Sequence, residues 1–309
     1  MKIIELDNKN YIPESFCYNG SIIRYKDKLL RATRVEPYSD PNNLSAVYIG
    51  ELNEDYTPKD KLTKLNIPNP TTGKHKFEDP RLFIYLGRLF CSFINYRVGG
   101  VSNQGMLELT DNFQVKQVWY PKYGNNHNAA LQEEEKSVML SQGVWTLPRN
   151  LNTFPEKNWS FFEYDEDLCF IYTLNPLVIV QFDLETEECL PVTKGEVLPL
   201  KGHGFISGGT CPQKIGRSYK GFYHSFLLDE ITTQRTYYFG YYELDELLRM
   251  RFISAPLYTA KAKGTRCMHK VIFPCGQIFD KNKIIVSCGY GDDYNWILEF
   301  DKKELLTFC

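Results

Sequence analysis

Two acids and a base stand at the beginning of an apolar run, in the segment FEDPRLF at residues 77–83. Glu78, Asp79 and Arg81 surround a proline, and the residues that follow have the composition of a buried β-strand. Two interpretations are open. The group is either a solvated strand end in which Arg81 pairs with one of the acids, or it presents a carboxylate to a pocket. A carboxyl group in a partly desolvated pocket has a raised pKa and suits general acid catalysis.

The segment EKNWSFF at residues 156–162 has a similar design, with polar groups before an apolar run. Lys157 offers a cation and Asn158 an amide, and Trp159 offers a face on which a sugar could stack. Each also has a plain structural interpretation, a solvated strand end for Lys157 and a core position for Trp159. Arg149 adds a second cation in an expected loop upstream.

Three further groups come later in the chain. Gly209 lies in the segment GGTCPQK, whose glycines let a backbone approach a ligand closely or form a bulge, and Lys214 ends that segment. His224 stands among aromatic residues, where it is either a site residue or a satisfied core histidine. Asp292 and Asp293 follow a glycine-rich strand end and could bind sugar hydroxyls or solvate a loop.

No motif for a metal, nucleotide or organic cofactor accompanies these groups. The histidines lack metal-ligand spacing, and no phosphate-binding loop, nucleophile elbow or dinucleotide fingerprint is present. The 9 cysteines are scattered, form no CxxC pair and mostly lie in apolar runs, which predicts buried reduced thiols and a cytoplasmic protein. We therefore expect no metal and no cofactor.

Composition excludes several classes of partner. The net charge of −2 over 309 residues argues against a nucleic acid bound through bulk charge. No window approaches the roughly 20 apolar residues that span a bilayer, and the acidic start is not a signal peptide, so no membrane partner is expected. The aromatic content of 15% is common to sugar-binding clefts and to β-rich cores.

One hairpin pattern recurs along the chain and predicts the fold. A polar start, an apolar strand, a short polar turn and a second apolar strand appear in five copies, which suits an all-β, five-bladed β-propeller with four strands per blade in a single catalytic domain, 1–309. The alternative is a β-sandwich with coincidental hairpins. Apolar residues have convincing helical spacing only in 243–252, which predicts a short helix there. The copies are 19–34, 78–97, 156–176, 208–226 and 273–293, with turns near Asp27, Gly87, Glu166, Arg217 and Lys281.

The repeat also places the polar residues. Aligned on their turns, the first four copies bring Asn19, Asp79, Asn158 and Gly209 to the same phase, where each innermost strand begins. Because the innermost strands of all blades line the central channel, we expect these groups to converge on a binding site at its mouth. Adjacent strand residues point to opposite faces, so only one of Glu78 and Asp79 should face the channel.

Together these motifs resemble glycoside hydrolase family 130, the inverting β-mannoside phosphorylases and related β-mannosidases, which are five-bladed propellers. The resemblance runs from about residue 19 to residue 293, through NGSIIRYKDKLLRA, EDPR, EKNW, SGGTCP, FYH, FPCG and a closing GxGD. It implies that Asp79 is the catalytic acid. It implies substrate-binding roles for Asn19, Ser21, Arg31, Glu78, Arg81, Asn158, Gly209 and Asp292, and makes Arg149, Lys157, Lys214 and His224 the candidates for binding phosphate.

The reaction that the resemblance implies is reversible phosphorolysis of β-mannosyl oligosaccharides. Asp79 protonates the glycosidic oxygen, through the 3-hydroxyl of the bound mannose, and inorganic phosphate attacks the anomeric carbon from the opposite face to give α-mannose 1-phosphate. Phosphate is then the co-substrate and nucleophile, so no second carboxylate is needed, but cations must hold the dianion.

Other activities stay open. The segment between Met106 and Arg149 lacks the His-Arg pair expected of many phosphorylases, and the acids at 133–135 there are read as a solvated run. The chain is also similar to β-1,2-mannosyltransferases that use GDP-mannose. An inverting hydrolase would need a second carboxylate roughly 6.5–9.5 Å from the acid. A non-catalytic carbohydrate-binding propeller, the linkage and a homo-oligomeric state are further open points.

Overall fold

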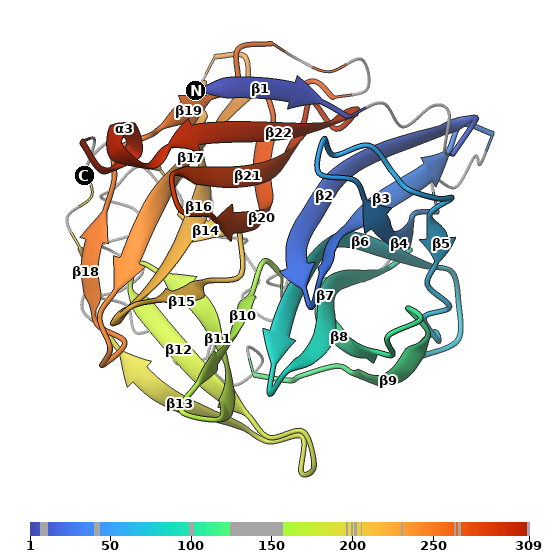
Figure 1. Cartoon of the computed structure of the whole chain (residues 1–309), viewed down its shortest axis with the longest axis horizontal. Coiled ribbons are helices and arrows are strands. Elements are labelled where there is room, and N and C mark those ends of the chain that lie inside the picture. The colour runs from blue at the N-terminus through green and yellow to red at the C-terminus, as the bar shows by residue number, and fades with distance from the viewer. Residues whose placement is uncertain are drawn as a thin grey trace.

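Each hairpin repeat is the inner part of a larger antiparallel sheet, and five such sheets surround a common axis (Figure 1). The structure is a computed structural model, and it confirms the five-bladed β-propeller and all five expected turns. The described residues are 1–6, 12–39, 44–98, 102–123, 157–195, 197–198, 200, 203–204, 206–229, 231–262, 264 and 267–307.

The blades follow one another along the chain. Blade 1 contains β2 (Ser15–Tyr25), β3 (Lys28–Pro37), β4 (Ala46–Leu52) and β5 (Thr63–Lys64). Blade 2 contains β6 (His75–Tyr85), β7 (Arg88–Arg97), β8 (Ser102–Leu109) and β9 (Val115–Trp119). Blade 3 contains β10 (Ser160–Tyr164), β11 (Asp167–Leu174), β12 (Leu177–Phe182) and β13 (Cys189–Lys194).

Blade 4 has its innermost strand in two pieces. β14 (Ser207–Gly208) and β15 (Gln213–Ile215) both pair with β16 (Ser218–Leu228). β17 (Arg235–Leu244) follows, and it pairs with β18 (Met250–Ile253) and with β19 (Tyr258–Thr259).

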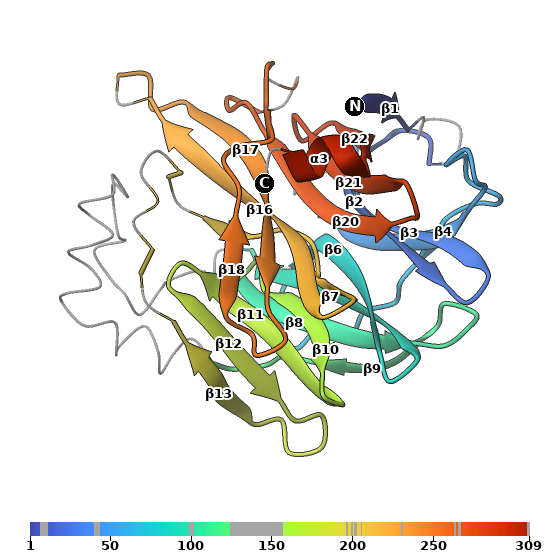
Figure 2. The same ribbon diagram turned by 60° about the vertical axis from the view of Figure 1, so that its left-hand side comes forward.

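The N-terminal strand closes the ring. Blade 5 contains β20 (Ile272–Phe279), β21 (Lys283–Tyr290) and β22 (Tyr294–Asp301), and β1 (Lys2–Glu5) pairs antiparallel with β22 as the outermost strand. The short helix α3 (Lys302–Thr307) follows β22 directly, and Figure 2 shows the two side by side. First and last parts of the chain thus complete one sheet, which ties the ring together.

The core lies between blades, which explains why the strands read as nearly continuous apolar runs. Alternate residues of β7 pack against opposite neighbours: Leu89 and Cys91 join the cluster shared with blade 1, whereas Phe90 joins the cluster shared with blade 3. Clusters of the same kind fill the interfaces of blades 3 and 4, 4 and 5, and 5 and 1. Because both faces of a blade are covered, neither face needs polar residues.

The helix expected at 243–252 is wrong. β17 continues to Leu244, and Asp245 then closes a turn by accepting the backbone N–H groups of Leu247 and Arg249, both at 2.9 Å. Leu244 at the strand end and Leu248 in the turn both pack into the cluster between blades 3 and 4. Their spacing therefore imitates that of residues on one face of a helix.

The cysteines agree with the expectation of free thiols. None of the 8 that the structure describes forms a disulfide, and 6 of them are buried. None of the helical structure in the described ranges could span a lipid bilayer.

Candidate active site

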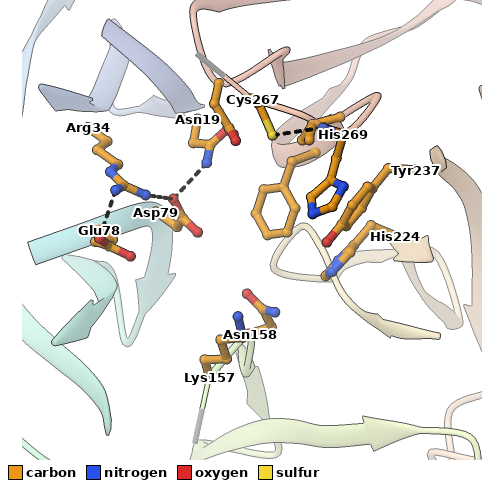
Figure 3. A pocket seen from close by; sticks show the side chains of 13 residues that line it. Asn19, Arg34, Glu78, Asp79, Lys157, Asn158, His224, Tyr237, Cys267 and His269 are labelled. Atoms are coloured by element: carbon orange, nitrogen blue, oxygen red, sulfur yellow. Dashed lines mark hydrogen bonds and ion pairs between the residues drawn. The ribbon is translucent and has the colours of Figure 1, made fainter. Parts of the chain in front are cut away.

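A pocket of about 210 Å³ lies where the inner strands of the five blades converge. This volume is below the roughly 300–1,000 Å³ typical of drug-sized ligands and suits a small polar ligand such as one sugar ring. Figure 3 shows the side chains that surround it. They are Asn19, Arg34, Glu78, Asp79, Lys157, Asn158, His224, Tyr237, Cys267, His269, Val271, Phe273 and Asp292.

Left-handed residues face this pocket from three inner strands: Asn19 and Asp79 lie within β2 and β6, not at their first residues as expected, and Asn158 lies just before β10. Asn19 has φ 51°, Asp79 has φ 50° and Asn158 has φ 67°. In β2 and β6 the register also shifts, between Tyr18 and Ser21 in one strand and at the corresponding bulge in the other. Asparagine and aspartate tolerate this backbone region better than most residues, which explains the recurrence of short polar residues at this phase.

The bulge in β6 corrects the expectation that only one of the two adjacent acids faces the channel. The pairing of β6 with β7 skips residues between Glu78 and Arg81, so the strict alternation of strand faces is lost there. Glu78 and Asp79 consequently both line the pocket.

Two neighbouring side chains contact one carboxylate oxygen of Asp79, and the other oxygen faces the pocket. Its Oδ1 accepts a hydrogen bond from Asn19 Nδ2 at 2.7 Å and an ion pair from Arg34 Nη1 at 3.4 Å. Oδ2 has no hydrogen-bond partner among the described residues, and Figure 3 shows the carboxyl group reaching toward the open centre of the pocket. Gly289 leaves room for the Asn19 amide, because a Cβ at Gly289 would collide with Asn19 Oδ1.

Arg34, which sequence reasoning missed, is the counter-ion of the acids. Its Nη2 contacts Glu36 at 2.5 Å and Glu78 at 2.7 Å, in addition to the contact with Asp79, and its guanidinium lies 4.8 Å from the centre of the Tyr18 ring. The guanidinium side chain is 13% exposed. Burial alone would lower the pKa of Arg34, but the surrounding carboxylates hold it well above its ordinary value. The salt bridge with Glu78 or Asp79 that the sequence suggested for Arg81 is thus made by Arg34 of blade 1.

Two of the pocket carboxyl groups have pKa values above the ordinary carboxyl range. Burial raises the pKa of Glu78, and the neighbouring Asp79 adds to the rise against the charge of Arg34. Burial also raises the pKa of Asp292, again with a contribution from Asp79.

The wall opposite the acids combines aromatic rings with two histidines (Figure 3). The ring of His224 lies 4.4 Å from that of Phe273 and 6.3 Å from that of Tyr237. Its Nδ1 lies 2.8 Å from the carbonyl oxygen of Gly208, so Nδ1 carries the proton and Nε2 is an acceptor when the ring is neutral. His269 has the opposite arrangement, because its Nδ1 accepts the backbone N–H of Arg235 at 3.2 Å.

His224 does not provide a permanent positive charge for binding phosphate. Burial lowers its pKa to about 3, and the charges of Arg81 and Lys157 act in the same direction. At neutral pH the ring therefore offers an acceptor to the ligand rather than a positive charge.

This pKa predicts an acid-sensitive component of stability. Unfolded His224 takes up a proton near its ordinary pKa of about 6.5, whereas the folded residue does so only near about 3, so unfolding binds a proton between these values. We expect the free energy of unfolding to fall by up to about 1.4 kcal/mol per pH unit through this one residue as pH drops below 6.5. Urea unfolding of His224→Gln between about pH 7 and 5 should show a correspondingly shallower decline. Equal slopes in the two proteins would contradict the prediction.

Several expected site residues lie elsewhere. Ser21 is buried and accepts the backbone N–H of Leu82, which joins blades 1 and 2. Arg31 is fully buried, and burial lowers its pKa to about 10. Gly209 packs against the Phe222 carbonyl, where a Cβ would collide.

One of the phosphate candidates does not line the pocket, and another cannot be placed. Lys214 is exposed on β15, its Nζ 5.6 Å from the centre of the Tyr219 ring, and Arg149 lies outside the described residues. Trp159 is 1% exposed and stacks on Phe170 at 4.4 Å, so it is a core residue. Lys157 is the described candidate cation that lines the pocket.

Sequence reasoning also missed part of the pocket lining. Arg34, Tyr237, Cys267, His269, Val271 and Phe273 were not selected. Phe273 opens the FPCG segment, so the fifth hairpin copy held a usable indication. Within the described residues, no group of three His, Cys, Asp or Glu side chains could hold a metal ion.

Comparisons with known proteins identify relatives by structure only. No protein-family model and no curated protein matches the chain in sequence. A β-1,2-mannobiose phosphorylase from Listeria innocua, solved with β-1,2-mannobiose, has a TM-score of 0.62 and 15% identity, over 99% of this chain and 99% of that one. A mannose phosphorylase from Leishmania mexicana, solved with a phosphate ion, has a TM-score of 0.60 and 15% identity, over 96% and 87%.

A third similar structure comes from the GH130 family of mannoside phosphorylases, which contains glycoside hydrolases that target β-1,2 mannosidic linkages in Candida mannan. It has a TM-score of 0.65 and 11% identity, over 94% of this chain and 85% of that one. At such identities the likeness concerns the fold. The chain therefore shares the five-bladed propeller of GH130 mannoside phosphorylases and of glycoside hydrolases built in the same way.

Proposed function

We propose that the protein is a carbohydrate-active enzyme that cleaves β-mannosides by inverting phosphorolysis, with Asp79 as the acid. The observation that carries the proposal is the carboxyl group of Asp79, which is fixed through Oδ1 by Asn19 and Arg34 and offers Oδ2 to the pocket. A general acid needs this combination of a fixed orientation and a free oxygen within reach of the leaving group. The named activities of the structural neighbours support the choice of mannosides and of phosphate.

The proposed reaction balances with the groups in the pocket. Protonated Asp79 gives its proton to the glycosidic oxygen, directly or through a substrate hydroxyl, as the bond from that oxygen to the anomeric carbon breaks. A phosphate oxygen forms the new bond to the anomeric carbon from the other face, which gives α-mannose 1-phosphate and leaves Asp79 ionised. The reverse reaction returns the proton to Asp79.

Lys157 is the proposed phosphate contact. Among the described pocket residues it is the cation with no carboxylate in an ion pair, whereas Arg34 contacts three acids. Figure 3 shows Lys157 and Asn158 across the pocket from Asn19. A phosphate there would approach the sugar from the side away from the Arg34 cluster, as an in-line displacement requires.

Hydrolysis is the second candidate, because more than one carboxyl group lines the pocket. Glu78 and Asp292 could each act as the base that activates water, which an inverting hydrolase requires and a phosphorylase does not. Transfer from GDP-mannose would draw on the same cation as phosphate.

One set of incubations separates these activities. The protein is supplied with β-1,2- or β-1,4-mannobiose with and without inorganic phosphate, and products are followed by ³¹P NMR and sugar chromatography. We expect α-mannose 1-phosphate only when phosphate is present, and β-mannoside synthesis when mannose 1-phosphate and mannose are supplied. Mannose release without phosphate would support hydrolysis, and synthesis from GDP-mannose alone would support the transferase.

A further inference from the structure

Arg81 is a buried cation directly behind the candidate pocket. It is 0% exposed and follows the bulge in β6 that carries Asp79. Nη2 donates a hydrogen bond to Asn158 Oδ1 at 3.0 Å, whereas Nε and Nη1 are buried without a hydrogen-bond partner in the described part of the chain. No ion pair found among the described residues includes Arg81. Keeping an unpaired guanidinium out of water is costly, so its position calls for an explanation.

The hydrogen bond and the ring contact of the Arg81 guanidinium both lead to residues that line the pocket. Asn158 precedes blade 3, and Phe273, whose ring centre lies 5.1 Å from the guanidinium, belongs to blade 5. The charge of Arg81 also acts on His224 of blade 4, where it lowers the pKa together with burial and with the charge of Lys157. One side chain of blade 2 thus bears on ligand-facing groups of three other blades.

The bond to Asn158 determines which way its amide faces. Arginine has only hydrogen-bond donors, so the atom of Asn158 that meets Nη2 must be the carbonyl oxygen. The amide nitrogen Nδ2 is therefore the group left for the pocket, and it has no hydrogen-bond partner among the described residues. Asn158 and Lys157 then form a patch of donors on the side of the pocket away from the Arg34 cluster (Figure 3).

We propose that Arg81 is a positioning residue for the phosphate co-substrate: it turns Asn158 Nδ2 toward the anion and places buried positive charge behind it. This inference rests on the proposed function, since the anion it serves is the phosphate of that reaction. The neutral ring of His224 lies near this donor patch and presents Nε2, which can accept a hydrogen bond from a phosphate hydroxyl. The bound phosphate would then meet a fixed set of donors and one acceptor.

Two substitutions test the role. Arg81→Met removes the charge and the hydrogen bond at similar length, and Arg81→Lys keeps the charge without the planar fork. We expect Arg81→Met to raise the KM for phosphate by roughly tenfold to a hundredfold, as for loss of a hydrogen bond to a charged group, with a much smaller change in the KM for the mannoside. Arg81→Lys should fall between Arg81→Met and the unsubstituted protein.

A spectroscopic measurement separates positioning from general support of the fold. The imidazole nitrogens of His224 report its tautomer and titration midpoint by ¹H–¹⁵N NMR. Removing the nearby charge in Arg81→Met should raise that midpoint, whereas Arg81→Lys should leave it nearly in place.

The matched control is Gln277→Met, another substitution of a buried polar side chain. Gln277 bonds the carbonyls of Cys211 and Lys220 and the hydroxyl of Thr210, and it does not line the pocket. We expect a loss of stability with an unchanged KM for phosphate. The proposal would be overturned if Arg81→Met affected phosphate no more than Gln277→Met does, or if the His224 midpoint did not move. If Arg81→Met does not fold, Arg81→Lys must still raise the KM for phosphate.

Titration calorimetry with inorganic phosphate alone keeps this test apart from that of the reaction. Should the protein bind phosphate through Arg81 but release mannose by hydrolysis, the proposed function fails and the role of Arg81 in anion binding stands. Should the protein be a phosphorylase whose affinity for phosphate is unchanged by substitution of Arg81, the proposed function stands and the proposed role of Arg81 fails. Absence of phosphate binding by the unsubstituted protein would overturn both.

Discussion

Replacing Asp79 with asparagine should lower turnover by about two to four orders of magnitude, the usual contribution of a general acid. The change keeps the shape of the side chain and an oxygen that can still accept from Asn19 and Arg34. It removes the proton that the leaving group needs. Steady-state rates with β-mannobiose and phosphate measure the effect, and calorimetry with the same sugar should show that binding is retained.

The control for this prediction is Asp229→Asn. Asp229 accepts the backbone N–H groups of Ile231 and Thr232 in an exposed turn, a role that asparagine can also fill. Its rate should match that of the unsubstituted protein. Full activity of Asp79→Asn would show that another group protonates the leaving oxygen, and Glu78 and Asp292, the pocket carboxyl groups with raised pKa values, would be the first to examine.

The fold was accessible from the sequence because its units are local. A hairpin is recognisable from its turn and from two apolar strands, and all five expected turns are present. The blade interfaces explain the apolar runs, since β7 buries both Leu89 and Phe90 on opposite faces. The helix expected at 243–252 failed because spacing does not distinguish one helical face from a strand end plus a turn, when Leu244 and Leu248 enter the same cluster.

The repeat phase located three pocket residues but not a fourth, because Gly209 shares the phase and does not line the pocket. Asn19, Asp79 and Asn158 share one phase and all line the pocket. Lys214 lies five residues beyond Gly209 in the sequence, which carries an extended chain roughly 16 Å along the blade at about 3.3 Å per residue. At this distance Lys214 lies toward the hairpin turn rather than at the channel mouth, so its charge alone does not indicate a phosphate contact.

The remaining parts of the site depend on contacts between blades. Nothing local marks Arg34 as different from any other basic residue at the end of a strand. It becomes the partner of Glu78 and Asp79 only when blades 1 and 2 are packed together. The bulge that brings both acids to the pocket is likewise set by pairing with β7, and a pattern of alternating faces cannot show it.

Replacing Arg34 with methionine should be the most destabilising single change in the site, by about 3–5 kcal/mol, as when one partner of a buried ion pair is removed. The substitution leaves Glu36, Glu78 and Asp79 together without their shared counter-ion, and Glu36 is only 3% exposed. Activity should fall as well, because Asp79 loses one of the two groups that hold Oδ1. Urea unfolding and steady-state rates measure the two effects.

A pH series shows whether the loss arises from charge. In Arg34→Met the carboxyl groups of the folded protein should have higher pKa values than they have in the unfolded chain. The folded variant therefore gains stability by binding protons as pH falls toward the ordinary carboxyl pKa of about 4. The difference in free energy of unfolding from the unsubstituted protein should consequently be largest near neutral pH and shrink in acid. Adding Glu36→Gln to Arg34→Met should recover part of the loss at neutral pH.

The matched control is Arg24→Met, in the strand that forms a hairpin with β3. Arg24 makes two short contacts with Glu54, at 2.9 and 2.6 Å, so by geometry alone this pair resembles the contacts of Arg34. The side chains of Arg24 and Glu54 are 43% and 76% exposed, however, and exposed pairs contribute only about 0–1 kcal/mol to stability. A loss in Arg34→Met no greater than in Arg24→Met would mean that the acids tolerate one another without the arginine. A larger loss that shrinks in acid would show that Arg34 is what allows several carboxyl groups, the proposed acid among them, to lie against one small pocket.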